Sequence, residues 1–197
     1  MNAEEPLKHK RDTLLYVTGN AVKFRQGELI CSKSNIHLTQ IKLGIPEIQA
    51  ESGEPIARDK AAKAYALAHQ PLVVSDDNWM IAGLKNFPGP YMKSMNDWFT
   101  AEDWLRLTDT LEDRTITLRQ IVVYQDAAEQ QLFSVDIPGI LLHDIRGKSP
   151  YAHAHITSFD GGKHSNAEHH ERGENASHSH HSPWDDFAAW YNSRNQS

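Results

Sequence analysis

Short apolar runs of strand character alternate with helical stretches along most of the chain, and this alternation is what most limits its fold. In the first half, strand-like segments lie at 14–20, 36–43 and 71–77, with helical segments at 21–33 and 57–70. The second helical segment, ARDKAAKAYALAHQ, is alanine-rich with Lys and Arg on its polar side, which favours a helix. Between the second strand and this helix, residues 46–55 are typical of a loop.

The second half of the chain adds a hairpin to this pattern. The expected elements are a short strand at 79–84, a helix at 101–113, two strands at 115–126 and 130–142, and a final helix at 185–193. The first of these helices follows Thr100, with Asp103 three residues later, close to a capping box. Strands and helices in alternation, followed by a hairpin, predict an α/β protein with a mixed sheet.

The size and charge of the chain bound the class of protein. A chain of 197 residues is long enough for one domain with a substantial core. The net charge of -6 argues against a nucleic-acid or membrane-surface binder, because both need basic patches. The sequence predicts a flexible leader at 1–12, a single domain over 13–191 with a His-rich segment at 151–183, and a tail at 192–197.

Two features bear on where such a chain works. No apolar run approaches the ~20 residues of a membrane span, and the first residues lack the apolar core of a secretory signal. The single cysteine, Cys31, has no partner for an internal disulfide, as is usual in a reducing cytoplasm. We therefore expect a cytoplasmic protein with a partly buried thiol and with neither a membrane nor a nucleic acid among its partners.

The stretch TGNAVK, from Thr18 to Lys23, stands where the first strand passes into the first helix. Backbone N–H groups at a helix N-terminus favour anions, and a lysine one turn further adds a positive charge. This pattern is typical of a phosphate site, although a structural turn with a surface lysine has the same sequence. The spacing is not that of a P-loop.

Two adjacent carboxylates, Asp76 and Asp77, follow the apolar run LVVS. In an open α/β sheet, ligands bind beyond the carboxyl ends of the strands, and this pair is expected at such an end. Neighbouring side chains on an extended backbone point different ways, so one carboxylate is free to hold Mg²⁺ while the other handles a water. The alternative is a solvated turn.

Three lysines are candidates for neutralising a phosphate chain. Lys60 and Lys63 share one face of the helix at 57–70, where a merely solvated face is the alternative. Lys93 follows a Pro-Gly-Pro-Tyr turn, which fixes the backbone and directs the next residues inward.

Eight of the twelve histidines lie after Gly147, in a segment rich in Ser and Gly without periodicity. The groups AHAH, EHH and HSHH are potential zinc or nickel ligands, because imidazole is a common ligand of both. No pair has the i, i+4 spacing of a zincin helix, and no cysteine accompanies them. Surface histidines in a flexible loop are the other interpretation.

In order and spacing, four motifs resemble the inosine triphosphate pyrophosphatase family, which hydrolyses deaminated purine nucleotides. The motifs are YVTGNAVK, IPEIQAE, VVSDDNWMIAGLKNFPGPYMKSMNDWF and the ending pattern DGGKHSNAE…ENASHSHH, and they cover most of residues 14–181. TGNxxK alone has little specificity, whereas TGNxxK, PE, DD and PGPY in this order are fairly specific.

The resemblance implies an elongated α/β fold whose two lobes enclose a central nucleotide-binding cleft, usually in a homodimer. It also implies hydrolysis of a nucleoside triphosphate to the monophosphate and pyrophosphate with Mg²⁺, for which Mn²⁺ is a possible substitute. By position, Glu47, Asp76 and Asp77 would bind the metal, with Asp77 also acting on the attacking water. The residues carried over for substrate binding are Thr18, Asn20, Lys23, Lys60, Lys93, Tyr151, Ser179 and His180.

The base-recognising half of the family pattern is altered. Asn78 and the bulky Trp79 follow the acidic pair, where the family has small residues or Thr/Ser. The segment 151–155 lacks the aspartate of the family's FGYDP motif, and Ser179-His180-His181 stands in place of SHR. A neutral imidazole does not replace a guanidinium. Tyr151 remains as a stacking group and His180 as a hydrogen-bonding group for a base.

Two hypotheses follow from this combination. The first is an active pyrophosphatase with altered base preference, for which the retained phosphate and metal residues argue. The second is a descendant that binds a nucleotide or a protein partner without turnover, for which the lost base-pocket residues argue. Pyrophosphate release from a panel of nucleotides separates the two.

Overall fold

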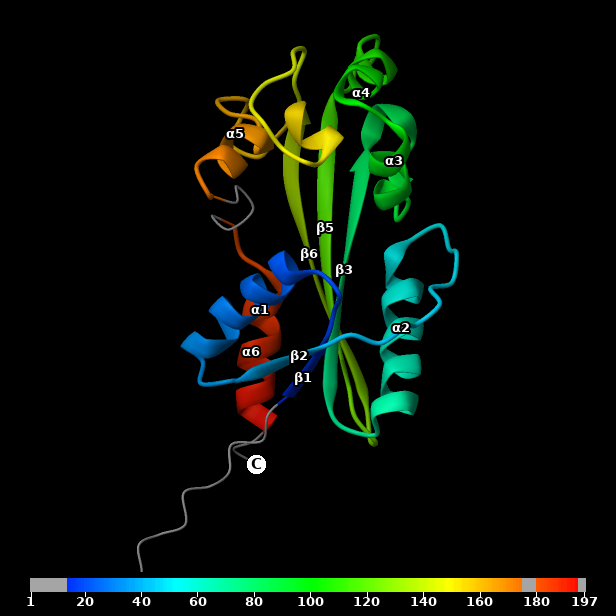
Figure 1. The fold of residues 1–197 in the computed structure, drawn as a ribbon, viewed down its shortest axis with the longest axis vertical. Coiled ribbons are helices and arrows are strands. Elements are labelled where there is room, and N and C mark those ends of the chain that lie inside the picture. The colour runs from blue at the N-terminus through cyan, green and yellow to red at the C-terminus, as the bar shows by residue number, and fades with distance from the viewer. Residues whose placement is uncertain (1–13, 175–179, 195–197) are drawn as a thin grey trace, which may run out of the picture.

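The fold is a long, twisted mixed sheet with helices on both faces, in a computed structural model that describes residues 14–174 and 180–194 (Figure 1). Its seven strands have the order β2-β1-β3-β5-β6-β7, and β4 pairs with β3. The strands are β1 Leu14–Val17, β2 Leu38–Ile41, β3 Leu72–Ile81, β4 Phe87–Gly89, β5 Thr115–Gln125, β6 Gln130–Leu141 and β7 Thr157–Ser158. The helices are α1 Ala21–Lys33, α2 Gly53–Ala68, α3 Met92–Trp98, α4 Ala101–Thr108, α5 Asn166–Glu171 and α6 Pro183–Arg194, with 3₁₀ turns η1 Ala82–Leu84 and η2 Ala152–His155.

Three long strands, β3, β5 and β6, run through the whole length of the molecule and join its two lobes (Figure 1). One lobe contains β1, β2, α1, α2 and α6, and the other contains α3, α4 and α5. The fold class expected from the sequence, an elongated mixed sheet with flanking helices in two lobes, is confirmed.

In the first lobe, helices cover both faces of the sheet. Trp184 and Phe187 of α6 pack with Tyr16, Val73 and Tyr124 on one face. On the other face, alanines of α2 pack against alternate residues of the same strands, namely Val17, Leu72, Val74, Ile121 and Val123. Such alternation is expected because successive side chains of a strand point to opposite faces. The second lobe has its own core, which includes Ile81, Trp104 and Ile156.

The parallel and antiparallel parts of the sheet meet on β3. Its first residues pair in parallel with β1, at Leu15↔Leu72 and Tyr16↔Val73. Beyond them, β3 continues without interruption to Ile81, paired only with antiparallel strands. The expectation that the third strand ends at Asp77 and that a separate strand covers 79–84 is therefore wrong, because β5 continues to provide hydrogen-bond partners where β1 stops.

Other sequence predictions need smaller corrections. Helix α2 begins at Gly53 and not at residue 57, so part of the expected loop is helical. Pro55 is tolerated there because N–H groups in the first turn have no partner within the helix. The His-rich segment is not uniformly flexible, since η2, β7 and α5 lie within it. Helix α6 reaches Arg194, into the expected tail, and the leader at 1–12 lies outside the described residues.

The other elements expected from the sequence are present. The hairpin of β5 and β6 is formed, and Thr100 and Asp103 make a full capping box on α4. Cys31 is completely buried and not partly buried as expected, and burial raises the pKa of its thiol to about 12. None of the helices in the described ranges is long and apolar enough to span a membrane.

An ion pair and hydrogen bonds connect α6 to the turn between β5 and β6. Arg194 forms an ion pair with Asp126 and donates a hydrogen bond to the Tyr124 hydroxyl at 2.7 Å, while that hydroxyl donates to Asp126 at 2.9 Å. Burial alone would raise the pKa of Asp126. The hydrogen bonds from Arg194, from two backbone N–H groups and from Tyr124 instead lower it to about 2.

We expect Asp126→Asn to lower the free energy of unfolding by about 2 kcal/mol at pH 7, because the carboxylate is favoured in the folded state. A depressed pKa stabilises the fold above the unfolded-state pKa of about 4, and this stabilisation is lost as pH falls toward 2. Urea unfolding of both proteins between pH 7 and pH 3 should therefore show a difference that shrinks with acidity. A constant difference would contradict this account.

Candidate active site

The turn between β1 and α1 forms as the sequence indicates. The Asn20 side chain caps α1, where its Oδ1 accepts hydrogen bonds from the N–H groups of Val22 and Lys23 at 2.8 and 3.3 Å. The Asn20 N–H donates to Thr18 Oγ1 at 3.1 Å. Because Oδ1 is used in the cap, the amide NH₂ is the part of Asn20 that can donate to an anion.

Lys23 and Asp77 form an ion pair beside this helix N-terminus. Lys23 Nζ lies 3.0 Å from Asp77 Oδ2, and each side chain is less than one-third exposed. Burial by itself lowers the pKa of Lys23, but the negative charges of Asp77 and Asp76 raise it above its ordinary value. Lys23 is therefore a fixed positive charge, as a phosphate-binding residue must be.

Asp76 and Asp77 point to opposite faces of β3. Asp77 joins Lys23 on the face covered by α1 and α6, and Asp76 follows the alternation to the face covered by α2. The Asp77 N–H donates to Asp76 Oδ1 at 3.0 Å. Burial is the main cause of the raised pKa of Asp76, and the negative charge of Asp77 adds to it. The positive charges of Lys23 and Lys60 lower this pKa but do not offset the burial. In the described part of the chain, no cationic side chain forms an ion pair with Asp76. This partly buried carboxylate fits a cation.

On the α2 side, Glu47 accepts a hydrogen bond from Lys60 Nζ at 2.8 Å. Burial alone would raise the pKa of Glu47. The hydrogen bond and charge of Lys60, followed by the charges of Lys23 and Lys93, lower it below its usual value. Lys63 turns elsewhere, to the Pro46 carbonyl at 3.1 Å and to Asp59 at 2.6 Å.

Of the four lysines and three carboxylates predicted from the sequence, all but one lysine lie near enough to influence the charge of another member. Glu47, Asp76, Asp77, Lys23, Lys60 and Lys93 act on one another electrostatically, whereas Lys63 has other partners. Within the described residues, the carboxylates of Glu47, Asp76 and Asp77 do not form a group of ligands within 4.8 Å. Their oxygen-only donor set nevertheless fits Mg²⁺ better than a softer metal.

A small cavity lies beside the Lys23–Asp77 pair. Its lining residues are Tyr16, Lys23, Gln26, Ser75, Asp77, Gln120, Ile121, Val122, Pro183 and Trp184. Gln120 pairs directly with Asp77 across the strands, and its Oε1 is buried without a hydrogen-bond partner among the described residues. An unpaired buried acceptor costs free energy, so this side of the cavity favours a ligand with a donor group.

Most residues of this cavity are not marked by any sequence motif. Ser75 could have been found, because it lies two residues before Asp77 on the same face of the strand. Gln120 and Trp184 could not, since their position depends on the pairing of β3 with β5 and on the packing of α6.

Asn78 explains why α2 begins with glycine. A Cβ atom on Gly53 would lie 2.0 Å from Asn78 Nδ2, so any side chain here would force the buried Asn78 side chain to move. The unusual residue after the acidic pair therefore packs against the start of the helix that carries Lys60.

Trp79 packs against the second lobe. Its ring contacts that of His153 edge-on, with centroids 4.4 Å apart, and that of Phe159 at 5.8 Å. Burial, with the charges of His170 and His155, lowers the pKa of His153 to about 3, so the ring is neutral. His153 Nδ1 lies 2.8 Å from Asn96 Oδ1, to which it donates. The first histidine of AHAH is thus a core residue, and the partly buried Trp79 packs against it.

The residues expected at the base are less completely defined. Tyr151 is 40% exposed, with its ring 6.2 Å from those of His153 and His170. His180 Nε2 lies 3.3 Å from the Phe159 carbonyl oxygen. Ser179 lies outside the described residues.

These features define an α/β protein with a lysine and carboxylate site where the parallel part of a long mixed sheet ends. The chain belongs to the Ham1 family, whose model matches residues 14–182. The resemblance found in the sequence motifs is confirmed.

Similar proteins agree with this assignment. The chain is 29% identical over 149 residues to the dITP/XTP pyrophosphatase of Methanosarcina acetivorans, which covers 75% of this chain and 81% of the relative. It is 38% identical over 87 residues to the inosine triphosphate pyrophosphatase of Tuber melanosporum, with 44% of this chain and 45% of the relative covered. The Staphylococcus aureus Ham1 protein has the same fold, with a TM-score of 0.74 at 13% identity over 92% of this chain and 99% of that one.

Proposed function

We propose that this chain hydrolyses nucleoside triphosphates to the monophosphate and pyrophosphate, with deaminated purine nucleotides as first substrates. The observation that carries the proposal is the Lys23–Asp77 pair at the N-terminus of α1, beside the carboxylate of Asp76. The named activities of the relatives support it.

In this proposal, the positive groups hold the triphosphate. Asn20 and Thr18 lie at the start of α1, where Lys23 adds a positive charge. Lys60 and Lys93 add positive charge near Glu47. Phosphoryl transfer depends mainly on charge neutralisation and on an aligned nucleophile, which these groups supply.

We propose that Glu47, Asp76 and Asp77 hold the divalent metal, with Mg²⁺ as the native ion and Mn²⁺ as a substitute; binding would bring these carboxylates closer together than they lie here. When bound, it neutralises charge on the phosphates. Asp77 accepts a proton from the attacking water, and the unpaired Oε1 of Gln120 accepts the second hydrogen of the same water.

The test is a panel of natural and deaminated nucleoside triphosphates assayed with Mg²⁺ or Mn²⁺. We expect equal amounts of monophosphate and pyrophosphate, with higher kcat/KM for dITP, ITP and XTP than for dATP and dGTP. Release of single phosphate in place of pyrophosphate would overturn the reaction type. Binding by calorimetry without turnover of any nucleotide would instead favour the non-catalytic hypothesis.

We further propose a cytoplasmic homodimer. The dimer is inferred from the family resemblance alone, and light scattering on the purified full chain tests it.

A further inference from the structure

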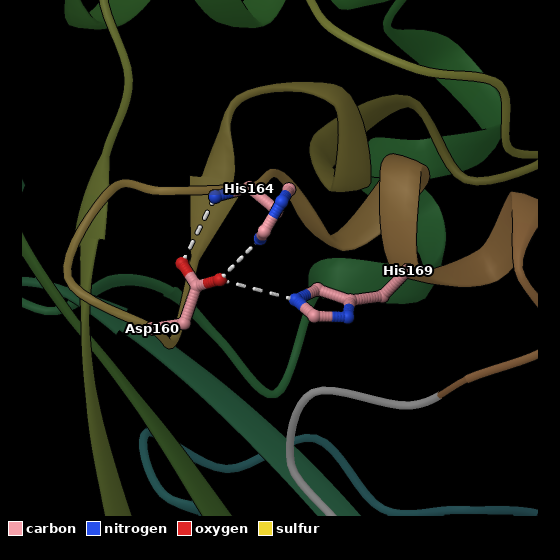
Figure 2. A group of neighbouring side chains, drawn as sticks. All are labelled: Asp160, His164 and His169. Atoms are coloured by element: carbon pink, nitrogen blue, oxygen red, sulfur yellow. Dashed lines mark hydrogen bonds and ion pairs between the residues drawn. The ribbon is translucent and has the colours of Figure 1, made fainter.

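Part of the histidine-rich segment folds into a compact group of potential metal ligands. Asp160, His164 and His169 point toward one another from the loop after β7 and from α5 (Figure 2). His164 Nδ1 and His169 Nε2 lie 2.8 and 3.3 Å from the same oxygen, Asp160 Oδ2, and all three ligand atoms lie within 4.8 Å of one another. Each of the three residues is partly buried.

The local backbone creates this arrangement. Gly161 and Gly162 have φ values of 74° and 85°, which side chains rarely allow, and they turn the chain back toward Asp160. The returning His164 N–H donates to Asp160 Oδ1 at 3.0 Å. A capping box of Ser165 and Glu168 then begins α5, which carries His169. The group is therefore held by specific turns and a capped helix.

The second nitrogen of His169 has the partner that a metal ligand needs. His169 Nδ1 lies 2.9 Å from Glu174 Oε2, and Arg172, whose Nη2 is 3.2 Å away, itself pairs with Glu174. In the metal-free protein, Nε2–H can donate to Asp160 while Nδ1 accepts from Arg172; when a metal is bound, an Nδ1–H that donates to Glu174 leaves the Nε2 lone pair for the metal. Metal-bound histidines commonly have this carboxylate partner, which fixes the tautomer.

We propose that Asp160, His164 and His169 bind a divalent transition metal, of which Zn²⁺ fits best. Two imidazole nitrogens with one carboxylate oxygen favour zinc over Mg²⁺, which prefers oxygen ligands. Tetrahedral zinc with bonds of about 2.0–2.2 Å keeps its ligand atoms roughly 3.3–3.6 Å apart. The spacings of 2.8 and 3.3 Å to Asp160 need only a small expansion. Three protein ligands leave the fourth position to a water.

This site is distinct from the oxygen-only set of Glu47, Asp76 and Asp77. Among the residues that the structure describes, EHH is the one histidine group of the sequence that contributes to it. In AHAH, His153 is in the core and His155 lies 3.1 Å from the Gly147 carbonyl. In HSHH, His181 pairs with Asp186.

Zinc binding is tested on the full chain, purified without a histidine tag and stripped of metal. Titration with Zn²⁺ against a chromogenic chelator should show one tight equivalent per chain. His164→Gln and His169→Gln should each weaken it at least tenfold, and Glu174→Gln by about tenfold. Co²⁺ in place of Zn²⁺ should give the visible absorption of a tetrahedral site, and the two histidine variants should lose it.

The matched control is His181→Gln, because His181 also lies beside carboxylates but outside the group. It should bind zinc as the unaltered chain does. Unfolding of the metal-free proteins checks that the variants fold, and the exposed Glu174 provides a variant that leaves the ligands in place. The proposal is overturned if the unaltered chain binds no tight equivalent, or if His181→Gln weakens binding as much as His164→Gln. Because no nucleotide is present, neither outcome depends on catalysis.

Discussion

Asp77→Asn should reduce pyrophosphate release by about 10²- to 10⁴-fold while leaving the fold intact. Asparagine has the shape of aspartate and keeps an oxygen for Lys23, whose Nζ lies 3.0 Å from the carboxylate. It cannot accept a proton from water, and it removes one negative charge from the proposed metal site. The loss should therefore fall on kcat more than on KM in a steady-state assay of the best substrate.

Asp126→Asn is the control for this change. It also removes a carboxylate from an ion pair, but at the far end of β5, where Arg194 holds it. Gln125 and Gln120 are five residues apart on that strand, or about 17 Å. The control should be less stable and retain full activity. If Asp77→Asn retained more than a tenth of the activity, Asp77 would not be the group that acts on water.

Lys23→Met should reduce kcat/KM by about 10²- to 10³-fold, the usual loss when one stabilising charge is removed from a reacting centre. Lys60 is already engaged with Glu47, so the carboxylates of Asp76 and Asp77 would lose their nearest counter-charge. We also expect a loss of about 1–3 kcal/mol in the free energy of unfolding. A steady-state assay of the purified variant measures kcat/KM, and urea unfolding measures the free energy of unfolding.

Two further variants test whether the losses in Lys23→Met come from the missing charge at this position. Lys33→Met removes an exposed lysine from the last turn of the same helix and should leave activity unchanged. The double variant Lys23→Met/Asp77→Asn removes both partners of the ion pair, so Asp77 no longer leaves an unpaired charge and part of the stability should return while activity stays low. A double variant as unstable as the sum of the single variants would show that the pair makes no net contribution.

The sequence predicts the elements of this fold better than their limits. Buried strands and the alanine-rich helix are recognisable because local periodicity and composition mark them. The continuation of β3 past Asp77 is not, since β5, more than thirty residues later, provides its partners. The start of α2 at Gly53 likewise depends on the close approach of Asn78.

Site residues that belong to local sequence motifs were predictable, whereas those brought in by strand pairing or helix packing were not. Lys23 and Asp77 were recognised from strand ends and motif order, and the structure pairs them. Gln120 and Trp184 come from elements whose neighbours no local pattern reveals. The Asp160 group was missed because its residues are spaced by a double-glycine turn and not by helical periodicity.

The continuity of β3 limits how this protein can change its substrate. Asp77 and Trp79 lie on one face of the strand, two residues and about 7 Å apart, and each is paired with a residue of β5. Hinge motion at this point would have to break the pairing of β3 with β5. In the function proposed above, side chains around Tyr151 can therefore be replaced without moving the strand that positions Asp77.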